Sequence, residues 1–235
     1  MGVLRELFAS TLGKKAVMAV SGLVLFGFVL VHMAGNLKLY QGPEKLNTYA
    51  AWLREIGTPA LPHSGLLWIA RLVLLVAVVA HMVSAYQLTA RSRRARPERY
   101  RVRRYVRADY ASRTMRWGGV IIALFVVYHL LHLTWGTVHP DFQHPVVAAD
   151  GTERYFAYQN VVAGFSVWWV SAFYMLAQVF LGLHLYHGLW SVLQTLGLER
   201  QSRQPWRRQV AAAFAVIVTA GNLSFPIAVL GGWVR

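Results

Sequence analysis

Five long apolar segments constrain this chain more than any other feature of its sequence. They cover about residues 15–39, 65–90, 117–137, 161–198 and 209–234 of 235. About 20 helical residues cross a hydrocarbon core of roughly 30 Å, so each segment is long enough to span a membrane. None alternates like a barrel strand, and backbone amides in lipid must bond within their own segment. We therefore predict an all-α integral membrane protein, a bundle of five transmembrane helices forming one domain over residues 1–235.

The basic residues are distributed unevenly between the two sides of the predicted bundle, and this predicts its orientation. Three Lys or Arg lie in residues 1–15, eleven in 91–116 and four in 199–208, against three in 40–64 and 138–160 together. Loops rich in Lys and Arg remain in the cytoplasm. We therefore expect a cytoplasmic N-terminus, an outer C-terminus and a location in the cell (inner or cytoplasmic) membrane.

The net charge of +15 does not by itself indicate nucleic-acid binding, because the positive charge is concentrated on one side. Segment 91–116 is expected to set the topology and to meet anionic lipid headgroups. The same charges suit docking of an acidic or polar cytoplasmic protein, and the sequence leaves both readings open. We expect membrane lipid, and no nucleic acid, among the partners.

Histidines within the predicted spans are the main functional signal. There are six of them: His32, His81, His129, His132, His184 and His187. Ionisable residues are costly inside a membrane and usually mark function there. The chain has no cysteine, and its predicted spans contain no Asp or Glu. A metal held within the membrane would therefore have histidine ligands.

The depths of these histidines predict two pairs on four different helices. At about 1.5 Å of rise per residue, His32 lies roughly 7 Å and His129 roughly 3 Å beyond the middle of their spans, toward the outer face. His81 lies roughly 5 Å and His184 roughly 7 Å toward the cytoplasmic face. The first and third helices thus supply an outer pair, and the second and fourth supply an inner pair.

Two histidines at equal depth on different helices can occupy the two axial positions of one haem iron. Zinc and di-iron centres instead need three or more ligands, often carboxylates. We therefore predict two b haems. Within the neighbours His129/His132 and His184/His187, one member can ligate iron while the other hydrogen-bonds a propionate, a quinone or a carbonyl. Small residues compatible with a close flat macrocycle are Gly22, Gly27, Gly35, Gly118, Gly119, Gly164, Gly182 and Gly188.

Four segments surround the candidate ligand histidines: VLVHMAGN, VVAHMVSAY, VVYHLLH and LHLYHGLWS. They resemble those of a known family, the single-chain dihaem cytochrome b subunit of succinate:quinone oxidoreductases. The last is the most distinctive, because a family ligand is followed by GLWS, and the resemblance covers all five helices. It implies that His32 and His129 hold the outer haem, and that His81 and His184 hold the inner haem. The roles of the neighbouring His132 and His187 stay open.

The resemblance implies a membrane anchor of respiratory complex II, that is, of succinate dehydrogenase or fumarate reductase. Electrons would pass from a flavoprotein subunit and an iron–sulfur subunit on the cytoplasmic side, through the haems, to membrane quinone. Succinate catalysis would then lie in other chains. Likeness to dihaem relatives favours menaquinone over another quinone. Some dihaem fumarate reductases are thought to pass protons by a glutamate two positions before the fourth ligand, and here that position is Gly182, which puts such a path in doubt.

Further candidate residues flank the two predicted haems. We expect Lys38 or Arg71, the basic residues nearest the outer ends of the first two spans, to pair with a propionate of the outer haem. We expect a quinone pocket near the cytoplasmic ends, close to the inner haem. Its candidate lining residues are Ser21, Ser84, Tyr86 and Trp117. Aromatic side chains at that depth are also typical of an interfacial belt.

Two other functions fit parts of the pattern. One is the cytochrome b of a membrane-bound hydrogenase or formate dehydrogenase, which is also dihaem but usually has four spans. The other is a haem-free transporter or proton channel that uses histidine relays. A reduced-minus-oxidised spectrum separates the second alternative, and the identity of the co-purified subunit separates the first.

Overall fold

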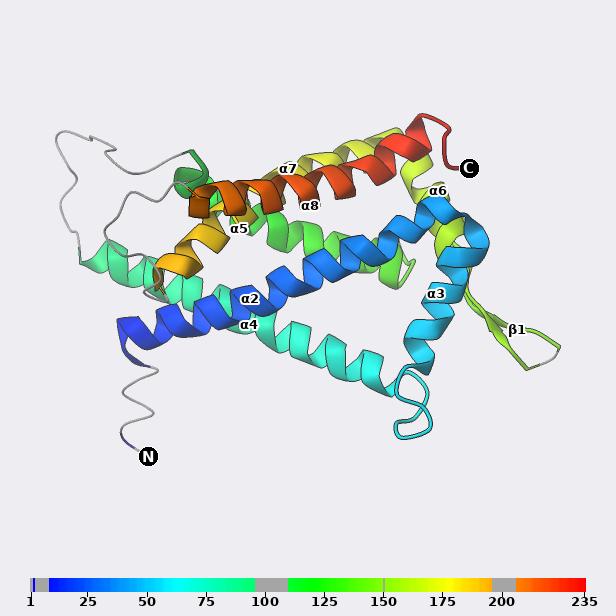
Figure 1. The fold of residues 1–235 in the computed structure, drawn as a ribbon, viewed down its shortest axis with the longest axis horizontal. Helices are drawn as coiled ribbons and strands as arrows, with labels where there is room; N and C mark the ends of the chain where they lie inside the picture. The colour runs from blue at the N-terminus through cyan, green and yellow to red at the C-terminus, as the bar shows by residue number, and fades with distance from the viewer. Residues whose placement is uncertain (1, 3–8, 96–109, 150, 196–205) are drawn as a thin grey trace.

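The chain forms five long helices, as the apolar segments predict. The computed structural model describes residues 2, 9–95, 110–149, 151–195 and 206–235. The long helices, drawn in Figure 1, are α2 (Thr11–Asn36), α4 (Gly65–Arg94), α5 (Tyr110–His129), α7 (Trp168–Thr195) and α8 (Trp206–Leu230). All five, with the turn that extends α5 to Thr134, are long and apolar enough to cross a membrane. The protein is therefore an all-α, multi-pass membrane protein.

The long helices pack in two groups. Helix α2 lies along α4, while α7 packs against both α5 and α8 (Figure 1). The groups meet where α2 contacts α7 and α8. Among the described residues, neither α2 with α5 nor α4 with α7 packs closely. The two members of each predicted histidine pair thus lie on helices of different groups.

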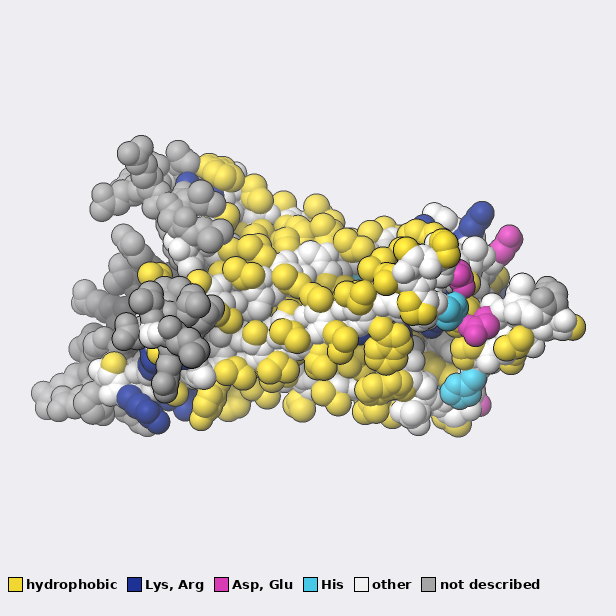
Figure 2. Space-filling view, turned by 90° about the horizontal axis from the view of Figure 1, so that it is seen from below, with side chains coloured by type: hydrophobic (Ala, Val, Ile, Leu, Met, Phe, Trp, Pro, Cys, Tyr) yellow, Lys and Arg dark blue, Asp and Glu magenta, His cyan; other side chains and the backbone are white. Residues whose placement is uncertain are grey.

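The surface between the ends of the bundle is apolar, as a lipid-facing surface must be. Hydrophobic side chains cover the middle of the face in Figure 2, and the Lys, Arg, Asp, Glu and His side chains lie near its ends. Val31, Val76 and Leu124 are each about two-thirds exposed. Such side chains would destabilise a soluble protein, whereas here they are placed to meet acyl chains.

Polar contacts at the end of the bundle where α2 begins tie α2 to α4. Ser10 caps α2, because its Oγ accepts a hydrogen bond from the Gly13 amide at 2.9 Å. The Arg91 guanidinium of α4 donates to the Ala9 carbonyl oxygen at 2.6 Å and to the Thr11 hydroxyl at 3.2 Å. Most of the predicted basic segment, residues 96–109, and also 199–205 lie outside the described residues.

The fourth apolar segment is not one continuous helix, which corrects the span predicted over 161–198. It divides at Val167, whose extended backbone (ψ 106°) separates α6 (Ala157–Ser166) from α7. The break leaves helix-end carbonyl groups without a helical donor. The buried Ser171 hydroxyl donates to one of them, the Phe165 carbonyl oxygen, at 2.6 Å. Residues 196–198 of the predicted span lie outside the described residues.

The opposite end of the bundle carries the short elements. The 3₁₀ turn η1 (Leu37–Gln41) continues α2 to Gly42, whose φ of 94° suits glycine, and α3 (Pro43–Glu55) then begins with proline in its first turn. Strands β1 (Val146–Val147) and β2 (Glu153–Arg154) form a small antiparallel hairpin. Helix α2 begins at one end of the bundle, and α8, the last long helix in the sequence, finishes at the other end (Figure 1).

Candidate functional site

The structure brings His32 of α2 next to His129 of α5. Their ring centroids are 5.9 Å apart, and the ring planes are nearly perpendicular, at 88°. His129 is the last residue of α5, and His32 lies four residues before the end of α2. The His32 side chain is exposed and that of His129 is half-buried. These are the two residues that the depth argument assigns to the outer pair.

A second pair forms between His81 of α4 and His184 of α7. Their ring centroids are 6.1 Å apart, with an interplanar angle of 63°. Both side chains are half-buried. The two pairs therefore have nearly equal ring spacing, although they come from four different helices.

The two pairs lie at different levels of the bundle, and two helices give the same separation. On α2, a Cβ built at Gly22 would lie 3.3 Å from the His81 ring, and His32 follows ten residues later. On α7, Tyr174 contacts His129, and His184 follows ten residues later. Ten helical residues rise about 15 Å. The pairs are thus roughly 15 Å apart along the helices.

Each pair spans two helices that do not pack closely on each other. His32 and His129 connect α2 to α5, and His81 and His184 connect α4 to α7. Among the described residues, close packing joins α2 to α4 and α5 to α7 instead. The imidazole rings therefore approach each other across the space between the two helix groups.

A hydrogen bond that His81 donates to the neighbouring helix sets its tautomer. Its Nδ1 lies 3.1 Å from the Met18 carbonyl oxygen and 3.4 Å from the Ser21 hydroxyl oxygen, both on α2. A carbonyl oxygen can only accept, so the proton is on Nδ1 and Nε2 keeps its lone pair. Metal-ligating histidines characteristically donate their other N–H to such a group. The arrangement leaves His81 Nε2 suitable for a metal ion.

A tyrosine hydroxyl plays the corresponding part for His129. Tyr174 Oη of α7 lies 3.3 Å from His129 Nδ1 and 2.9 Å from His132 Nδ1. His132 is fully buried in a π-helical turn, η2 (Leu130–Thr134), that extends α5. Single π-turns occur often at functional sites. His132 thus lies beside the His32–His129 pair, and its Nδ1 faces Tyr174.

The geometry of both pairs fits axial ligation of a haem iron. Two metal–imidazole bonds of about 2 Å and two nitrogen-to-centroid distances of about 1.2 Å place ring centroids up to about 6.4 Å apart. The observed spacings are 5.9 and 6.1 Å. The described residues contain no cluster of three or more His, Cys, Asp or Glu that could hold a metal ion. Two imidazoles would be enough to hold a haem iron, whose remaining ligands come from the porphyrin.

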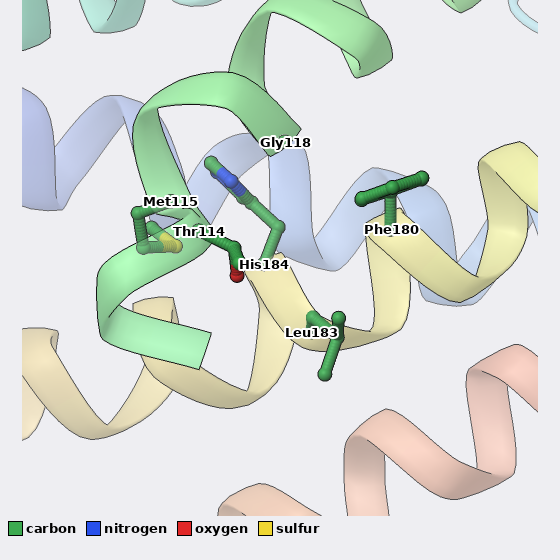
Figure 3. A pocket seen from close by; sticks show the side chains of 6 residues that line it. All are labelled: Thr114, Met115, Gly118, Phe180, Leu183 and His184. Carbon is green, nitrogen blue, oxygen red and sulfur yellow. The ribbon is translucent and has the colours of Figure 1, made fainter. Parts of the chain in front are cut away.

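Glycines border the His81–His184 pair, where side chains would otherwise crowd the rings. Besides Gly22, Gly119 of α5 would place a Cβ 4.0 Å from the His184 ring. Figure 3 shows a narrow crevice between α5 and α7 in which the His184 ring points toward α5 beside Gly118. Thr114 and Met115 also line this crevice. Small residues thus lie next to both imidazole rings of this pair.

The two candidate propionate partners lie on α4 and just beyond α2. The Lys38 ammonium lies 5.2 Å from the Tyr49 ring centroid, and the Arg71 guanidinium lies 4.8 Å from the Trp68 ring centroid. Both side chains are half-buried. Neither forms an ion pair with a carboxylate in the part of the chain that the structure describes. Their pairing with a propionate stays a prediction.

The four predicted quinone-pocket residues fall into two kinds. Ser21 and Ser84 are buried, and Ser21 lies beside His81 while donating its own proton to the Val17 carbonyl oxygen at 2.7 Å. Tyr86 and Trp117 are 75% and 77% exposed. The structure thus brings Ser21 into the surroundings of the His81–His184 pair, and it places the two aromatic side chains on the surface of the bundle.

Gly182 lies where helices α7 and α8 approach closely. A Cβ at this position would collide with the Thr219 hydroxyl of α8. A larger side chain would therefore require Thr219 to turn its hydroxyl away or α8 to shift. Close packing of α7 on α8 accounts for the small residue at position 182.

Sequence reasoning missed Tyr174 and the Met18 carbonyl group. A single tyrosine in an apolar helix carries no pattern that distinguishes it from an interfacial or packing residue. The partners of Tyr174 are 42 and 45 residues away along the chain, and only the packing of α5 on α7 brings them together. A carbonyl acceptor has no signature in the sequence at all.

Comparison with known proteins does not assign the chain to a family. No family model, curated protein or solved structure matches it. The argument for function therefore rests on the histidine segments and on the geometry of the two pairs.

Proposed function

We propose that this chain is the dihaem cytochrome b subunit, and the membrane anchor, of a succinate:quinone oxidoreductase. One observation carries the proposal: two histidine pairs, each joining two different long helices, lie at two levels of one membrane bundle with ring centroids 5.9 and 6.1 Å apart. His32 and His129 would hold one haem b, and His81 and His184 would hold the other. Bound there, haem iron supplies one-electron transfer by cycling between its ferric and ferrous forms.

The chain's own residues orient the ligands and exclude water. The Met18 carbonyl group fixes the His81 tautomer, and Tyr174 contacts His129. Apolar and aromatic side chains surround the Tyr174 region, including the buried Phe125 and Phe165. A dry surrounding, and hydrogen bonds to the ligating imidazoles, are the protein's means of tuning a haem potential. The described spanning helices carry no Asp or Glu that would compete for the ligands' protons.

The proposed partners follow from the charge distribution and the family resemblance. We place the basic end, which includes Arg91, Arg207 and Arg208, in the cytoplasm, with the C-terminus outside. An iron–sulfur subunit would dock on this end and would itself bind a flavoprotein subunit that carries out succinate chemistry. The His81–His184 pair would receive electrons first, because it lies nearer that end. The proposed membrane is the cell membrane.

Quinone is the proposed electron acceptor, with menaquinone favoured. Its pocket would lie beside the His81–His184 pair, near the basic end, where Ser21 and Ser84 are buried. Tyr86 and Trp117 would then border the pocket from the bundle surface. The proposal includes no proton path through position 182, which is glycine and packs on Thr219.

The test is reduction of the purified complex by different electron donors. The tagged chain is purified from its own membranes in mild detergent, and absorbance spectra are recorded before and after addition of succinate, hydrogen or formate. We expect flavoprotein and iron–sulfur subunits to co-purify, and succinate to reduce the b-haem bands. Reduction by hydrogen or formate alone would assign the chain to the other cytochrome b class. A haem-free preparation would favour a histidine-relay transporter.

A further inference from the structure

We propose that Tyr174 is the positioning residue for His129, and that it acts as the centre of a hydrogen-bonded chain from His129 through Tyr174 to His132. The inference rests on the proposed function, since it concerns how a haem ligand is held. Tyr174 Oη is 3.3 Å from His129 Nδ1 and 2.9 Å from His132 Nδ1. One hydroxyl on α7 therefore serves two histidines of the α5–η2 segment.

The number of protons available fixes which group donates and which accepts in the hydrogen bonds between His129, Tyr174 and His132. The tyrosine hydroxyl has one proton, so it can donate to only one of the two imidazoles and must accept from the other. If His129 binds iron through Nε2, its proton lies on Nδ1, and that N–H donates to Tyr174 Oη. The Tyr174 hydroxyl then donates to His132 Nδ1, at the shorter of the two distances.

The same count of protons separates the roles of the two neighbouring histidines. His132 accepts at Nδ1, so as a neutral imidazole it carries its proton on Nε2. That Nε2 is buried, and it faces Gly164, where a Cβ would lie only 2.8 Å away. With His129 as the ligand, His132 therefore has no free lone pair to offer a metal ion, and its Nε2–H has no acceptor among the described residues. We assign His132 to holding Tyr174, and His129 to ligation.

Packing fixes the hydroxyl in place. The Tyr174 side chain is 4% exposed, and its ring lies 5.1 Å from Phe125 and 5.0 Å from Phe165, in both cases edge-to-face. A ring enclosed in this way cannot turn its hydroxyl toward another acceptor. The hydrogen bonds between His129, Tyr174 and His132 are therefore part of the preorganised structure around the His32–His129 pair.

The main experiment replaces Tyr174 with phenylalanine in the whole complex. Tyr174→Phe removes the acceptor for the His129 N–H, which makes the imidazole a weaker electron donor to iron and favours the ferrous form. We expect the ferrous-to-ferric ratio of one haem, at fixed potential, to rise on the order of tenfold, or about 59 mV for one electron. The low-spin electron paramagnetic resonance signal of that haem should also shift, while the other haem keeps its potential and its signal.

Tyr128→Phe is the matched control. Tyr128 lies on α5, its ring stacks on His132 at 5.5 Å, and no hydrogen bond of its hydroxyl is found among the described residues. It loses the same oxygen atom in the same aromatic surroundings. We expect both haem potentials to stay at their wild-type values.

If the Tyr174→Phe complex fails to assemble, a second pair of variants tests the same series of hydrogen bonds. His132→Leu removes the acceptor of the Tyr174 proton, whereas His132→Asn keeps an acceptor on a side chain of similar reach. A hydroxyl that donates a hydrogen bond accepts more strongly than one that does not. His132→Leu should therefore shift the potential of the same haem in the same direction as Tyr174→Phe, by a smaller amount. His132→Asn should restore most of the wild-type potential.

Specific outcomes would overturn the inference. It fails if Tyr174→Phe retains two haems with unchanged potentials and signals, or if the shifted haem is the one lost in His81→Ala. It also fails if His132→Leu removes a haem outright. A wild-type complex without haem would instead refute the proposed function, so the two failures are distinguishable.

Discussion

The His32–His129 and His81–His184 pairs have almost the same ring spacing, but different kinds of group hold their histidines. His81 faces a backbone acceptor, the Met18 carbonyl oxygen at 3.1 Å. His129 faces a side-chain hydroxyl that is itself hydrogen-bonded to His132. A backbone acceptor survives any side-chain substitution nearby, whereas a hydroxyl is lost in a single change. If His129 holds a haem as proposed, the potential of that haem would be tunable by mutation without movement of the helices.

The surroundings of the two pairs differ in a second respect. At His81, Gly22 of the neighbouring helix lies against the ligand ring itself. On the His129 side, the corresponding glycine, Gly164, lies against His132, one step removed from the ligand. Added bulk should therefore act directly on the first pair and through an intermediate residue on the second.

Removal of a ligand should have the greatest effect and should sort the histidines into two classes. His32→Ala and His129→Ala should each abolish one haem species, and His81→Ala and His184→Ala should each abolish the other, because an iron held by one axial imidazole is no longer low-spin. Spectra and pyridine haemochrome analysis of each purified variant measure this. His187→Ala serves as the control that retains both. Loss of a common haem in His32→Ala and His81→Ala would disprove the pairing.

Bulk added beside His81 should weaken binding of one haem. Gly22→Val would press on the His81 ring, since even a Cβ would lie 3.3 Å from it. We expect the affinity for the haem assigned to His81 and His184 to fall roughly tenfold, the size of effect seen when a residue that contacts a metal ligand is changed. Haem per chain after gel filtration provides the measurement. Gly27→Val, on the same helix with nothing within 4 Å of its Cβ, should retain both haems, and equal loss in the two variants would contradict the account.

Bulk added behind His132 should have a smaller effect. Gly164→Ala would place a methyl group 2.7 Å from the His132 ring, so that ring must shift and its bond to Tyr174 must lengthen. Both haems should remain, with a potential shift in the haem assigned to His32 and His129, in the direction given by Tyr174→Phe. Redox titration checks this against Gly188→Ala, whose Cβ meets nothing within 4 Å. A shift confined to the other haem would be inconsistent with the hydrogen-bonded chain.

Ser21→Ala should have the smallest effect of the series. The Ser21 hydroxyl donates to the Val17 carbonyl oxygen and lies 3.4 Å from His81 Nδ1, while the Met18 acceptor remains in place. We expect both haems to be retained and the potential of the His81–His184 haem to move by less than in Gly164→Ala. A change in the potential of this haem as large as the change that Tyr174→Phe causes in the other haem would contradict this expectation. The Met18 carbonyl oxygen would then not be the main hydrogen-bond acceptor of His81.

The five helices and the placement of the pairs were accessible from sequence, because both follow from apolar length and helical rise. The break at Val167 was not, since neither proline nor glycine lies at the break, and the single polar neighbour, Ser166, is no helix-stop signal by itself. The carbonyl group that satisfies Ser171 lies in the preceding helix, so the break depends on tertiary packing. The same holds for Tyr174. Periodicity gives depth and face, whereas hydrogen bonds between helices require knowing which helices pack together.

The haem content of the wild-type protein tests the central claim most directly. Pyridine haemochrome analysis of the purified complex, with the chain quantified by amino-acid analysis, gives the number of haem b groups per copy. The account predicts two, both low-spin by electron paramagnetic resonance. A value of one would leave one of the two histidine pairs without its assigned role, and a value of zero would contradict the claim that either pair binds haem.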